Sequence, residues 1–508
     1  MSTAAGLLVW LYCQPFEDLF ITLRYAENWA TGTGLRFNPG EDVEGFSSFS
    51  WVAIHALAAL LRLDLDVVST VLSVAAGALM LVMITYGAKR IAGLPGLSAY
   101  MPALAVAVTA TWAYSAGTGM ETTAHAACIL LAWAVLSRDG TRRSLVAAGL
   151  FLGLALLTRP EAPAYVGAIA LGVALGRRGR DGIVVGGVAA ALFAPWLAWR
   201  WTHYGYPLPN TYYAKADPSW ELWLEGLRYV EAFMSTHVYW MALPLGVFAW
   251  RKEGDKNWLI LAFAVCGAAI VTSILGGGDT FFFYRFLLPA LPLLALLIVV
   301  GAVQLCRDLP PLKRHAVLGA AAALWIGMGV AAPRGLSTSL SWKGRVDEHK
   351  KTRSLNAFTR DYRAIGRLLR RDFPADTWIA TNAAGIIPYV SGLATIDMLG
   401  LNDAHIAHLD IELGHGPAGH EKYDGNYVLD RRPGVILFGL PRALRRPPNS
   451  AQELRAYLRR ITEHLPGDRE ILANPEFVRH YRPLVARLDD SRFALMFVRR
   501  GVEPRPKR

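Results

Sequence analysis

Long apolar runs alternate with short polar segments along the first two thirds of the chain. A run of about twenty apolar residues can cross the roughly 30 Å hydrocarbon core of a bilayer. The pattern therefore predicts a polytopic α-helical membrane protein with about eleven transmembrane helices. We expect them at residues 4–16, 64–88, 97–115, 122–137, 144–158, 161–176, 183–200, 237–250, 257–275, 284–304 and 315–332.

A further apolar stretch, residues 47–62, is short and is followed closely by Arg62, Asp64 and Asp66. These features favour a helix that lies in the membrane interface rather than one that spans. If this stretch spans instead, the count becomes twelve and the loops after it change sides.

The distribution of basic residues predicts the orientation of these helices. Short cytoplasmic loops are enriched in Lys and Arg. One set of five loops holds fourteen basic residues, near 89–90, 138–143, 177–180, 251–256 and 307–314, whereas the longer opposite loops hold six. The N-terminus is therefore expected in the cytoplasm, and the region from 334 to 508 outside it.

The last third of the chain has a different pattern. Helix-like segments alternate with short apolar runs, "TWIAT", "GVILFGL" and "FALMFVRR", which is typical of a small α/β domain. We therefore expect two domains: a transmembrane domain over residues 1–333 and an extracytoplasmic α/β domain over residues 334–508.

Composition agrees with a membrane protein. The 508 residues are 53% hydrophobic and 18% charged, against about 25% charged in soluble domains. The net charge of +12 is carried largely by short loops and the Arg-rich C-terminal third, without a basic arm with interleaved aromatics. We therefore expect the lipid bilayer as a partner and no nucleic acid.

Conspicuous polar residues recur in the loops that this topology places outside the cytoplasm. They are Glu17, Asp18, Glu121, Arg159, Glu161, Asn210, Lys215, Asp279 and Arg285. A transport path needs ionisable residues at mid-membrane depth, so polar residues gathered on one face favour an active site. A carboxylate just outside the bilayer can act as the general base for a hydroxyl acceptor. Glu17 and Asp18 are candidates for that base, although Asp18 could equally be a helix N-cap.

The segment that contains this pair, "EDLFITLRYAENWATGTGLRFNPGEDVEGFSSFSW", resembles the first extracytoplasmic loop of the GT-C glycosyltransferase superfamily. The likeness is to the group that contains the mycobacterial terminal β-arabinofuranosyltransferase. The matching positions run from Asp18 through Arg24, Asn38 and Glu44 to Phe46, with Asp42 inserted. Glu17 departs from the family pattern, which has Asp there, so the resemblance leaves open which carboxylate is the base.

Later segments resemble the same superfamily, in the same order. They are "SAGTGMETT" with Glu121, "LLTRPEAP" with Arg159 and Glu161, "YGYPLPNTYYAK" with Asn210 and Lys215, "GGGDTFFFYRFLLPALP" with Asp279 and Arg285, and "TNAAGIIPYVSGLATIDMLGLNDAHIA" over residues 381–407. The likeness covers nearly the whole chain and implies a GT-C-type fold in the membrane domain.

The resemblance implies an inverting glycosyltransferase with a polyprenyl-phosphate sugar donor, here decaprenyl-phosphoryl arabinofuranose. Fixed cations could hold the lipid phosphate, and Lys215, Arg285 and Arg159 are the candidates, with ion pairs to neighbouring acids as the alternative. Asn210, Asp279, Glu121, Glu161 and Glu44 are candidates for binding the sugar or the acceptor. Asp397 and Asp403 could contact the acceptor or simply cap their loop.

No cofactor is implied, because side chains can neutralise a monophosphate leaving group, although a divalent metal stays open. His405, His408, His415 and His420 lack the carboxylate or Cys partners of a metal site. The acceptor would be an extracytoplasmic glycan or glycoprotein, at a bacterial inner membrane. Two alternatives remain: a relative that transfers another hexose or aminosugar, and a lipid-linked saccharide transporter without chemistry.

Overall fold

The computed structural model describes residues 15–177, 179–215, 219–279, 283–331, 348–411, 421–489 and 491–505. The chain divides into two compact units, each assembled from separate segments. The helical unit contains Asp66–Ala198 and Pro218–Thr352, and the sheet unit contains Phe16–Leu65, Trp199–Asp217 and Arg353–Arg508.

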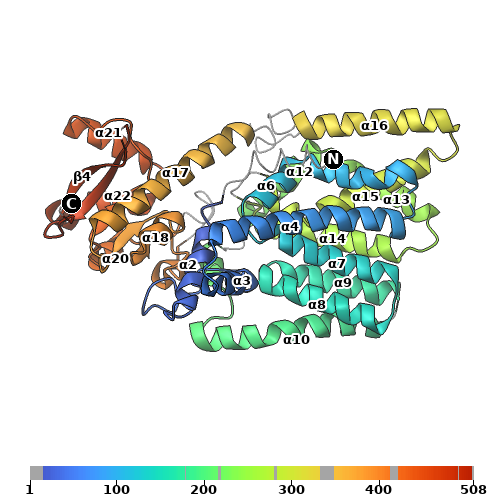
Figure 1. Cartoon of the computed structure of the whole chain (residues 1–508), viewed down its shortest axis with the longest axis horizontal. Helices are drawn as coiled ribbons and strands as arrows, with labels where there is room; N and C mark the ends of the chain where they lie inside the picture. The colour runs from blue at the N-terminus through green and yellow to red at the C-terminus, as the bar shows by residue number, and fades with distance from the viewer. Residues whose placement is uncertain are drawn as a thin grey trace. The chain divides into compact units, whose positions relative to one another are not determined.

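Most helices belong to the helical unit, where Figure 1 shows α7, α8, α9 and α14 running side by side. The longer helices are α4 (Leu65–Tyr86), α7 (Thr122–Arg138), α8 (Arg142–Thr158), α9 (Ala162–Gly176), α10 (Gly179–Tyr204), α12 (Trp220–Thr236), α14 (Asn257–Leu275), α15 (Leu291–Leu305) and α16 (Pro311–Ala331). The shorter ones are α5 (Met101–Ala107), α6 (Ala110–Gly117), α13 (Ala242–Lys252) and the single turns η1 (Gly87–Ile91), η2 (Gly96–Tyr100), η3 (Tyr239–Met241) and η4 (Arg285–Leu287).

Side-chain caps define several helix starts. The hydroxyls of Thr109, Thr141 and Ser219 accept a backbone N–H three residues on, at the starts of α6, α8 and α12. Each cap satisfies one of the backbone N–H groups that the first helical turn leaves without an intrahelical partner. The breaks between helices are therefore encoded locally.

Three described helices are long and apolar enough to cross a membrane, namely the stretches Leu65–Ile91, Gly179–Tyr204 and Asn257–Leu275. Two bent pairs pass the same test: α5 with α6 is bent by 64°, and α12 with α13 is bent by 89°. With three to five such spans, the chain has the features of a multi-pass membrane protein.

Every predicted span from residue 64 onward contains a helix, whereas residues 4–14 of the run at 4–16 lie outside the described residues. The count of eleven crossings is not confirmed, because several of these helices are shorter than a span and because α5, α6, α12 and α13 form two bent pairs. Residues 47–62 form α3 (Phe49–Leu60), and its interfacial position stays a prediction.

One difference from the predicted pattern is α12, because the sequence placed residues 201–236 in a loop. Glu221, Glu225, Arg228 and Glu231 interrupt its apolar run. The buried residues Tyr229, Val230 and Phe233 lie on its other face. An amphipathic helix of this kind has no continuous apolar run, so a search for spans misses it.

The sheet unit is built around a five-stranded mixed sheet in the order β2-β1-β3-β5-β4. The strands are β1 (Ile379–Thr381), β2 (Thr395–Asp397), β3 (Val435–Leu437), β4 (Tyr481–Arg487) and β5 (Phe493–Arg499). β1 pairs in parallel with β2 and β3, whereas β5 pairs antiparallel with β3 and β4. The expected small α/β domain is confirmed as a fold, and its three predicted apolar runs became β1, β3 and β5.

The helices of the sheet unit come from three parts of the chain. They are α2 (Leu19–Ala30), α3, α11 (Asn210–Lys215), α17 (Glu348–Asp372), α18 (Ile386–Ser391), α19 (Ala404–Ala407), α20 (Gly425–Asp430), α21 (Ala451–Ile461), α22 (Pro466–Ala473) and α23 (Pro475–His480). The division predicted at residues 333 and 334 lies outside the described residues. Among the described residues, segments 16–65 and 199–217 group with the sheet.

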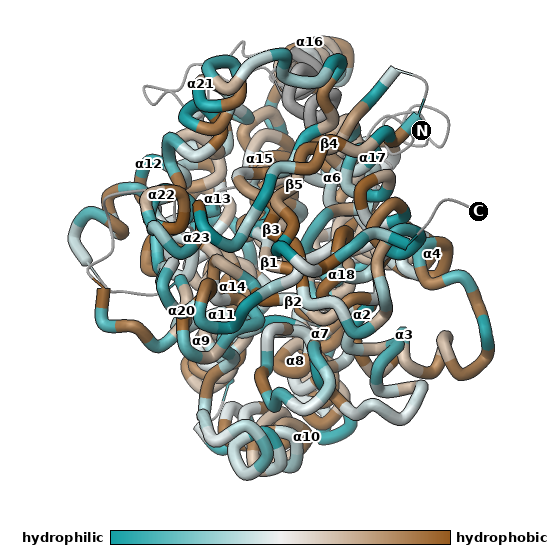
Figure 2. Tube along the Cα trace, turned by 90° about the vertical axis from the view of Figure 1, so that its left-hand side faces the viewer, coloured by the Kyte–Doolittle hydropathy of each residue, from teal (hydrophilic) through white to brown (hydrophobic). Residues whose placement is uncertain are grey.

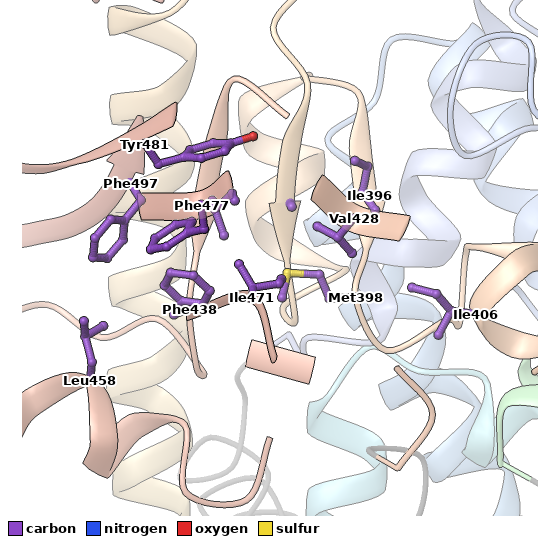
Figure 3. Packing of buried hydrophobic residues seen from close by; sticks show 12 residues of the cluster. Ile396, Met398, Ile406, Val428, Phe438, Leu458, Ile471, Phe477, Tyr481 and Phe497 are labelled. Carbon is purple, nitrogen blue, oxygen red and sulfur yellow. The ribbon is translucent and has the colours of Figure 1, made fainter. Parts of the chain in front are cut away.

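An apolar cluster holds the sheet to its covering helices. Phe438, Phe477, Phe497 and Tyr481 place their rings against one another (Figure 3), with ring centroids 5.2–5.4 Å apart for the closest pairs. The central strands β1, β3 and β5 are hydrophobic along their length (Figure 2). β1 and β3 are buried at every position, as expected for strands that are covered on both faces.

Candidate active site

In the helical unit, antiparallel packing of α7, α8 and α9 brings charged residues from separate loops to one end. Glu121 directly precedes α7, Arg159 directly follows α8, and Glu161 directly precedes α9. Because α8 runs back along both α7 and α9, its last residue lies beside the first residues of its neighbours. The predicted convergence of these three residues is therefore found in the structure.

Arg159 is the centre of this cluster. Its Nη1 donates to Oε1 of Glu121 at 2.8 Å, and its Nε donates to Oε1 of Glu161 at 2.5 Å. The Arg159 and Glu121 side chains are less than a tenth exposed.

Asp279 and Arg285 form a second ion pair in the same unit. Arg285 Nε donates to Asp279 Oδ2 at 2.5 Å and Nη2 donates to Oδ1 at 3.3 Å. The two arginines flank Phe286, with the Arg159 and Arg285 guanidinium carbons 5.3 and 5.5 Å from its ring centroid. Arg285 Nη1 also lies 3.4 Å from the sulfur of Met120, next to Glu121.

These five charged residues carry three carboxylates and two guanidinium groups, and we call them the ion cluster: Glu121, Arg159, Glu161, Asp279 and Arg285. Both arginines are paired with acids in the described structure. An anionic ligand that reached Arg159 or Arg285 would have to compete with a carboxylate for the same N–H donors.

The loop before Arg285 has an unusual backbone. Gly277 and Gly278 have φ values of +72° and +74°, and a Cβ on Gly278 would lie 2.6 Å from the Cβ of Tyr229. Phe283 and Tyr284 also have positive φ, at 70° and 52°. Non-glycine residues in this region cost energy and occur where the surroundings over-determine the backbone, often at functional sites.

In the sheet unit, the adjacent carboxylates Glu17 and Asp18 have different environments. Both Glu17 oxygens accept backbone N–H groups, Oε1 from Gly385 at 2.8 Å and Oε2 from Ile386 at 3.1 Å. Asp18 occupies the N-cap position of α2, yet its side chain makes no capping hydrogen bond and is partly exposed. The alternative function of Asp18 as a helix cap is therefore not supported.

Glu44 lies in the interior of the sheet unit and faces Arg200, at the C-terminal end of α10. Its Oε2 is 3.5 Å from Arg200 Nε, and both side chains are at least nine-tenths buried. Burial raises the pKa of Glu44 to about 8, and Arg200 only partly offsets that shift. The backbone carbonyl of Glu44 also accepts the N–H of Asn210 at 2.9 Å.

Asn210 and the two C-terminal aspartates bind the backbone of a single turn. Asn210 Nδ2 lies within 2.8–3.2 Å of the carbonyl oxygens of Gly400, Leu401 and Asp403. Asp397 accepts the N–H groups of Leu399 and Asn402, and Asp403 caps α19. These contacts favour the loop-capping interpretation of both aspartates.

Lys215 is the last residue of α11 and is exposed. The described part of the chain contains no group of three His, Cys, Asp or Glu residues arranged to hold a metal ion. Within it, His405 stacks on Tyr427 and pairs with Asp424, while His415 and His420 lie outside the described residues.

The fold of this chain is similar to that of proteins with solved structures. ArnT from Cupriavidus metallidurans, in its crystal structure bound to undecaprenyl phosphate, superposes with a TM-score of 0.55 over 78% of this chain and 84% of ArnT, at 13% identity. The apo structure of ArnT matches with a TM-score of 0.53 over the same shares of each chain, at 14% identity. ArnT is a GT-C glycosyltransferase. This chain has the GT-C fold.

Two matches come from sequence. The terminal β-(1→2)-arabinofuranosyltransferase of Mycobacterium tuberculosis is 26% identical over 392 residues, which is 66% of this chain. The match spans 61% of the length of that curated relative. Residues 351–494 match a family described as a domain of unknown function, DUF8728. The resemblance to the GT-C superfamily found in the sequence is confirmed.

The importance of some residues became clear only from the structure. Phe286, Arg200 and Arg24 were not assigned a role from sequence. Arg24 was visible as a match to the family loop, and Phe286 as the neighbour of Arg285. No sequence motif indicated a function for Arg200, because Arg200 and its partner Glu44 are far apart in the chain.

Proposed function

We propose that this protein is an integral-membrane glycosyltransferase that transfers a sugar, D-arabinofuranose, from a polyprenyl-phosphate donor to an extracytoplasmic glycan or glycoprotein. The observation that carries the proposal is the GT-C fold shared over 78% of the chain with a protein captured with undecaprenyl phosphate. The arabinofuranose donor is supported by the 26% identity to the mycobacterial arabinofuranosyltransferase.

The proposed reaction is a direct displacement with inversion at the anomeric carbon. The carboxylate of Asp18 takes the proton of an acceptor hydroxyl as that oxygen bonds to the anomeric carbon. The bond from this carbon to the phosphate oxygen breaks, and its electron pair leaves with the lipid phosphate. The local geometry favours Asp18 over Glu17, because both Glu17 oxygens already accept backbone N–H groups.

Charge on the leaving phosphate is stabilised by cationic side chains, for which we propose Lys215, Arg285 and Arg159. Lys215 is exposed, whereas each arginine must exchange a carboxylate partner for phosphate. The acids of the ion cluster, with Glu44 and the Asn210 side-chain oxygen, are the proposed sugar or acceptor contacts. We place the site on the extracytoplasmic face of the inner membrane.

The test is a transfer assay with the purified full-length chain in lipid nanodiscs. Radiolabelled decaprenyl-phosphoryl arabinofuranose is offered with an arabinan oligosaccharide, and product linkage is determined. Labelled product with inverted configuration supports the proposal. Product only from a polyprenyl-phosphoryl hexose or aminosugar would reassign the donor. Donor binding without transfer to any acceptor, from any of these donors, would contradict an enzyme and indicate a carrier.

A further inference from the structure

Within the sheet unit, helix α18 is contacted by Glu17, which directly precedes the N-cap of α2, and by two side chains of α2 itself. Phe20 and Arg24 are spaced four residues apart, so they lie on the same side of α2. Glu17 contacts the start of α18 and Arg24 contacts its end. The aromatic ring of Phe20 lies between them, 5.4 Å from the ring of Tyr389.

The Glu17 contacts match the start of the helix that they hold. The first turn of a helix presents unpaired N–H groups and partial positive charge. The Glu17 carboxylate accepts the N–H groups of Gly385 and Ile386. The Arg24 guanidinium donates to the carbonyls of Pro388 at 2.6 Å and Leu393 at 2.8 Å.

Gly385 packs directly against the main chain of Glu17. A Cβ added to Gly385 would lie 2.0 Å from the carbonyl oxygen of Glu17. That same carbonyl accepts the N–H of Phe20 at 3.1 Å, in the first turn of α2. The main chain and the carboxylate of Glu17 are therefore both fixed, and Asp18 is the next residue along this fixed chain.

We infer that Glu17 is a positioning residue. Its carboxylate accepts the N–H groups of Gly385 and Ile386, a pair of hydrogen bonds that we call the clasp. The clasp holds the main chain at Asp18, and thereby the Asp18 carboxylate, in the geometry that proton abstraction requires. This inference rests on the proposed function, in which Asp18 is the base. A displacement of about 1 Å at a reacting group can cost on the order of 100-fold in rate. A residue that touches no substrate can therefore control turnover.

The experiment compares four full-length variants in nanodiscs. Glu17→Gln weakens the clasp, Gly385→Ala forces it open from the opposite side, and Asp18→Asn removes the base. Glu27→Gln is the matched control, because Glu27 is an exposed glutamate of α2, the helix that Glu17 precedes. Hydrogen exchange of the peptide that contains residues 385–393 reports the clasp, and kcat with donor KM reports its consequence.

We expect faster exchange at residues 385–393 in Glu17→Gln and Gly385→Ala, but not in Glu27→Gln. In Glu17→Gln, kcat should fall about 10- to 100-fold with donor KM changed less than about twofold. In Glu17→Gln, kcat should still fall at low pH as it does in the wild type (the acid limb of the pH profile), because Asp18 is still present to ionise. Asp18→Asn should lose about 10² to 10⁴ in kcat while exchange stays at the wild-type rate.

Two results would overturn the inference. Wild-type exchange in both Glu17→Gln and Gly385→Ala would show that no clasp exists. Loss of the acid limb in Glu17→Gln, with turnover retained in Asp18→Asn, would make Glu17 itself the base. If the wild type transfers no sugar, the proposed function fails and the positioning role fails with it, whereas the exchange data still report on the clasp.

Discussion

Glu44 is a buried carboxyl whose protonation is coupled to the stability of the sheet unit. Among the described residues, its Oε2 has no hydrogen-bond partner, and Arg200 Nε lies 3.5 Å from it. Burial raises its pKa to about 8. Burial also raises the pKa of Glu17 to about 7 and that of Asp397 to about 6. The same direction of shift recurs at several acids of this unit.

We predict that thermal stability falls as the pH rises from about 5 to 8. A carboxyl with a folded-state pKa above its unfolded value stabilises the protonated protein, and this stabilisation is lost as the pH rises through the folded pKa. Melting curves of the wild type and Glu44→Gln test this. The variant should lose less stability between pH 7 and 8, because it has no proton to release, whereas Glu27→Gln should follow the wild type. Parallel curves for all three proteins would contradict the assignment to Glu44.

The arginines of the ion cluster have a structural and a proposed functional role, which one set of variants can separate. Removing one partner of a buried pair leaves an uncompensated charge and costs roughly 3–5 kcal/mol. We expect Arg285→Ala to lower the melting temperature and weaken decaprenyl phosphate binding. The double variant Arg285→Ala with Asp279→Asn should recover stability but not binding.

Lys215→Ala is the matched comparison for Arg285, because Lys215 is exposed and its removal leaves no buried partner. A lost charge-assisted hydrogen bond of roughly 1.5–3 kcal/mol corresponds to about 10- to 100-fold weaker decaprenyl phosphate binding, with unchanged melting. Full recovery of binding in the double variant would reassign Arg285 to a purely structural pair. Unchanged binding in Lys215→Ala would remove Lys215 from the donor site.

At the scale of the element, the sheet depends on aromatic packing from α23. Phe477 is 5% exposed and lies against Phe438, Phe497 and Tyr481, whereas its neighbour Val478 is 66% exposed. Truncating a buried Phe to Ala typically costs 3–5 kcal/mol, because the cavity left behind does not fully close.

We therefore predict that Phe477→Ala destabilises the sheet unit by about 3–5 kcal/mol, whereas Val478→Ala changes stability by less than about 0.5 kcal/mol. Hydrogen exchange in β3 and β5 under mild denaturant measures the effect in the full chain. Equal protection in the two variants would mean that the aromatic cluster does not carry the stability of the sheet.

At the scale of the whole molecule, the distribution of basic loops makes a prediction about topology. Basic residues are enriched in the loops near 138–143 and 177–180, and such loops remain in the cytoplasm. Reporter fusions at residues 140 and 180 should therefore read cytoplasmic, and a fusion at 385 should read extracytoplasmic. The first two serve as controls for the third. A cytoplasmic signal at 385 would exclude an extracytoplasmic active site that includes Glu17.

The sequence by itself determined the class of fold and the identity of the candidate residues. Apolar run length and basic loops depend on local chemistry, so most apolar helices between α4 and α16 and the apolar strands β1, β3 and β5 were predictable, whereas α11 and the amphipathic α12 were not. The order of motifs around Asp18, Arg159 and Arg285 was sufficient to indicate a GT-C protein, because those motifs are also local.

Only the tertiary structure decided what those residues contact. That Glu17 binds Gly385 and Ile386, that Arg24 binds the other end of α18, and that Glu44 faces Arg200 are contacts between segments far apart in the chain. No spacing rule relates such positions, because their proximity results from packing of the whole sheet unit. Tertiary packing also distinguishes Glu17 from its neighbour Asp18. Both are acidic residues in the same sequence segment, but the fold supplies backbone N–H donors to the Glu17 side chain and no capping hydrogen bond to the Asp18 side chain.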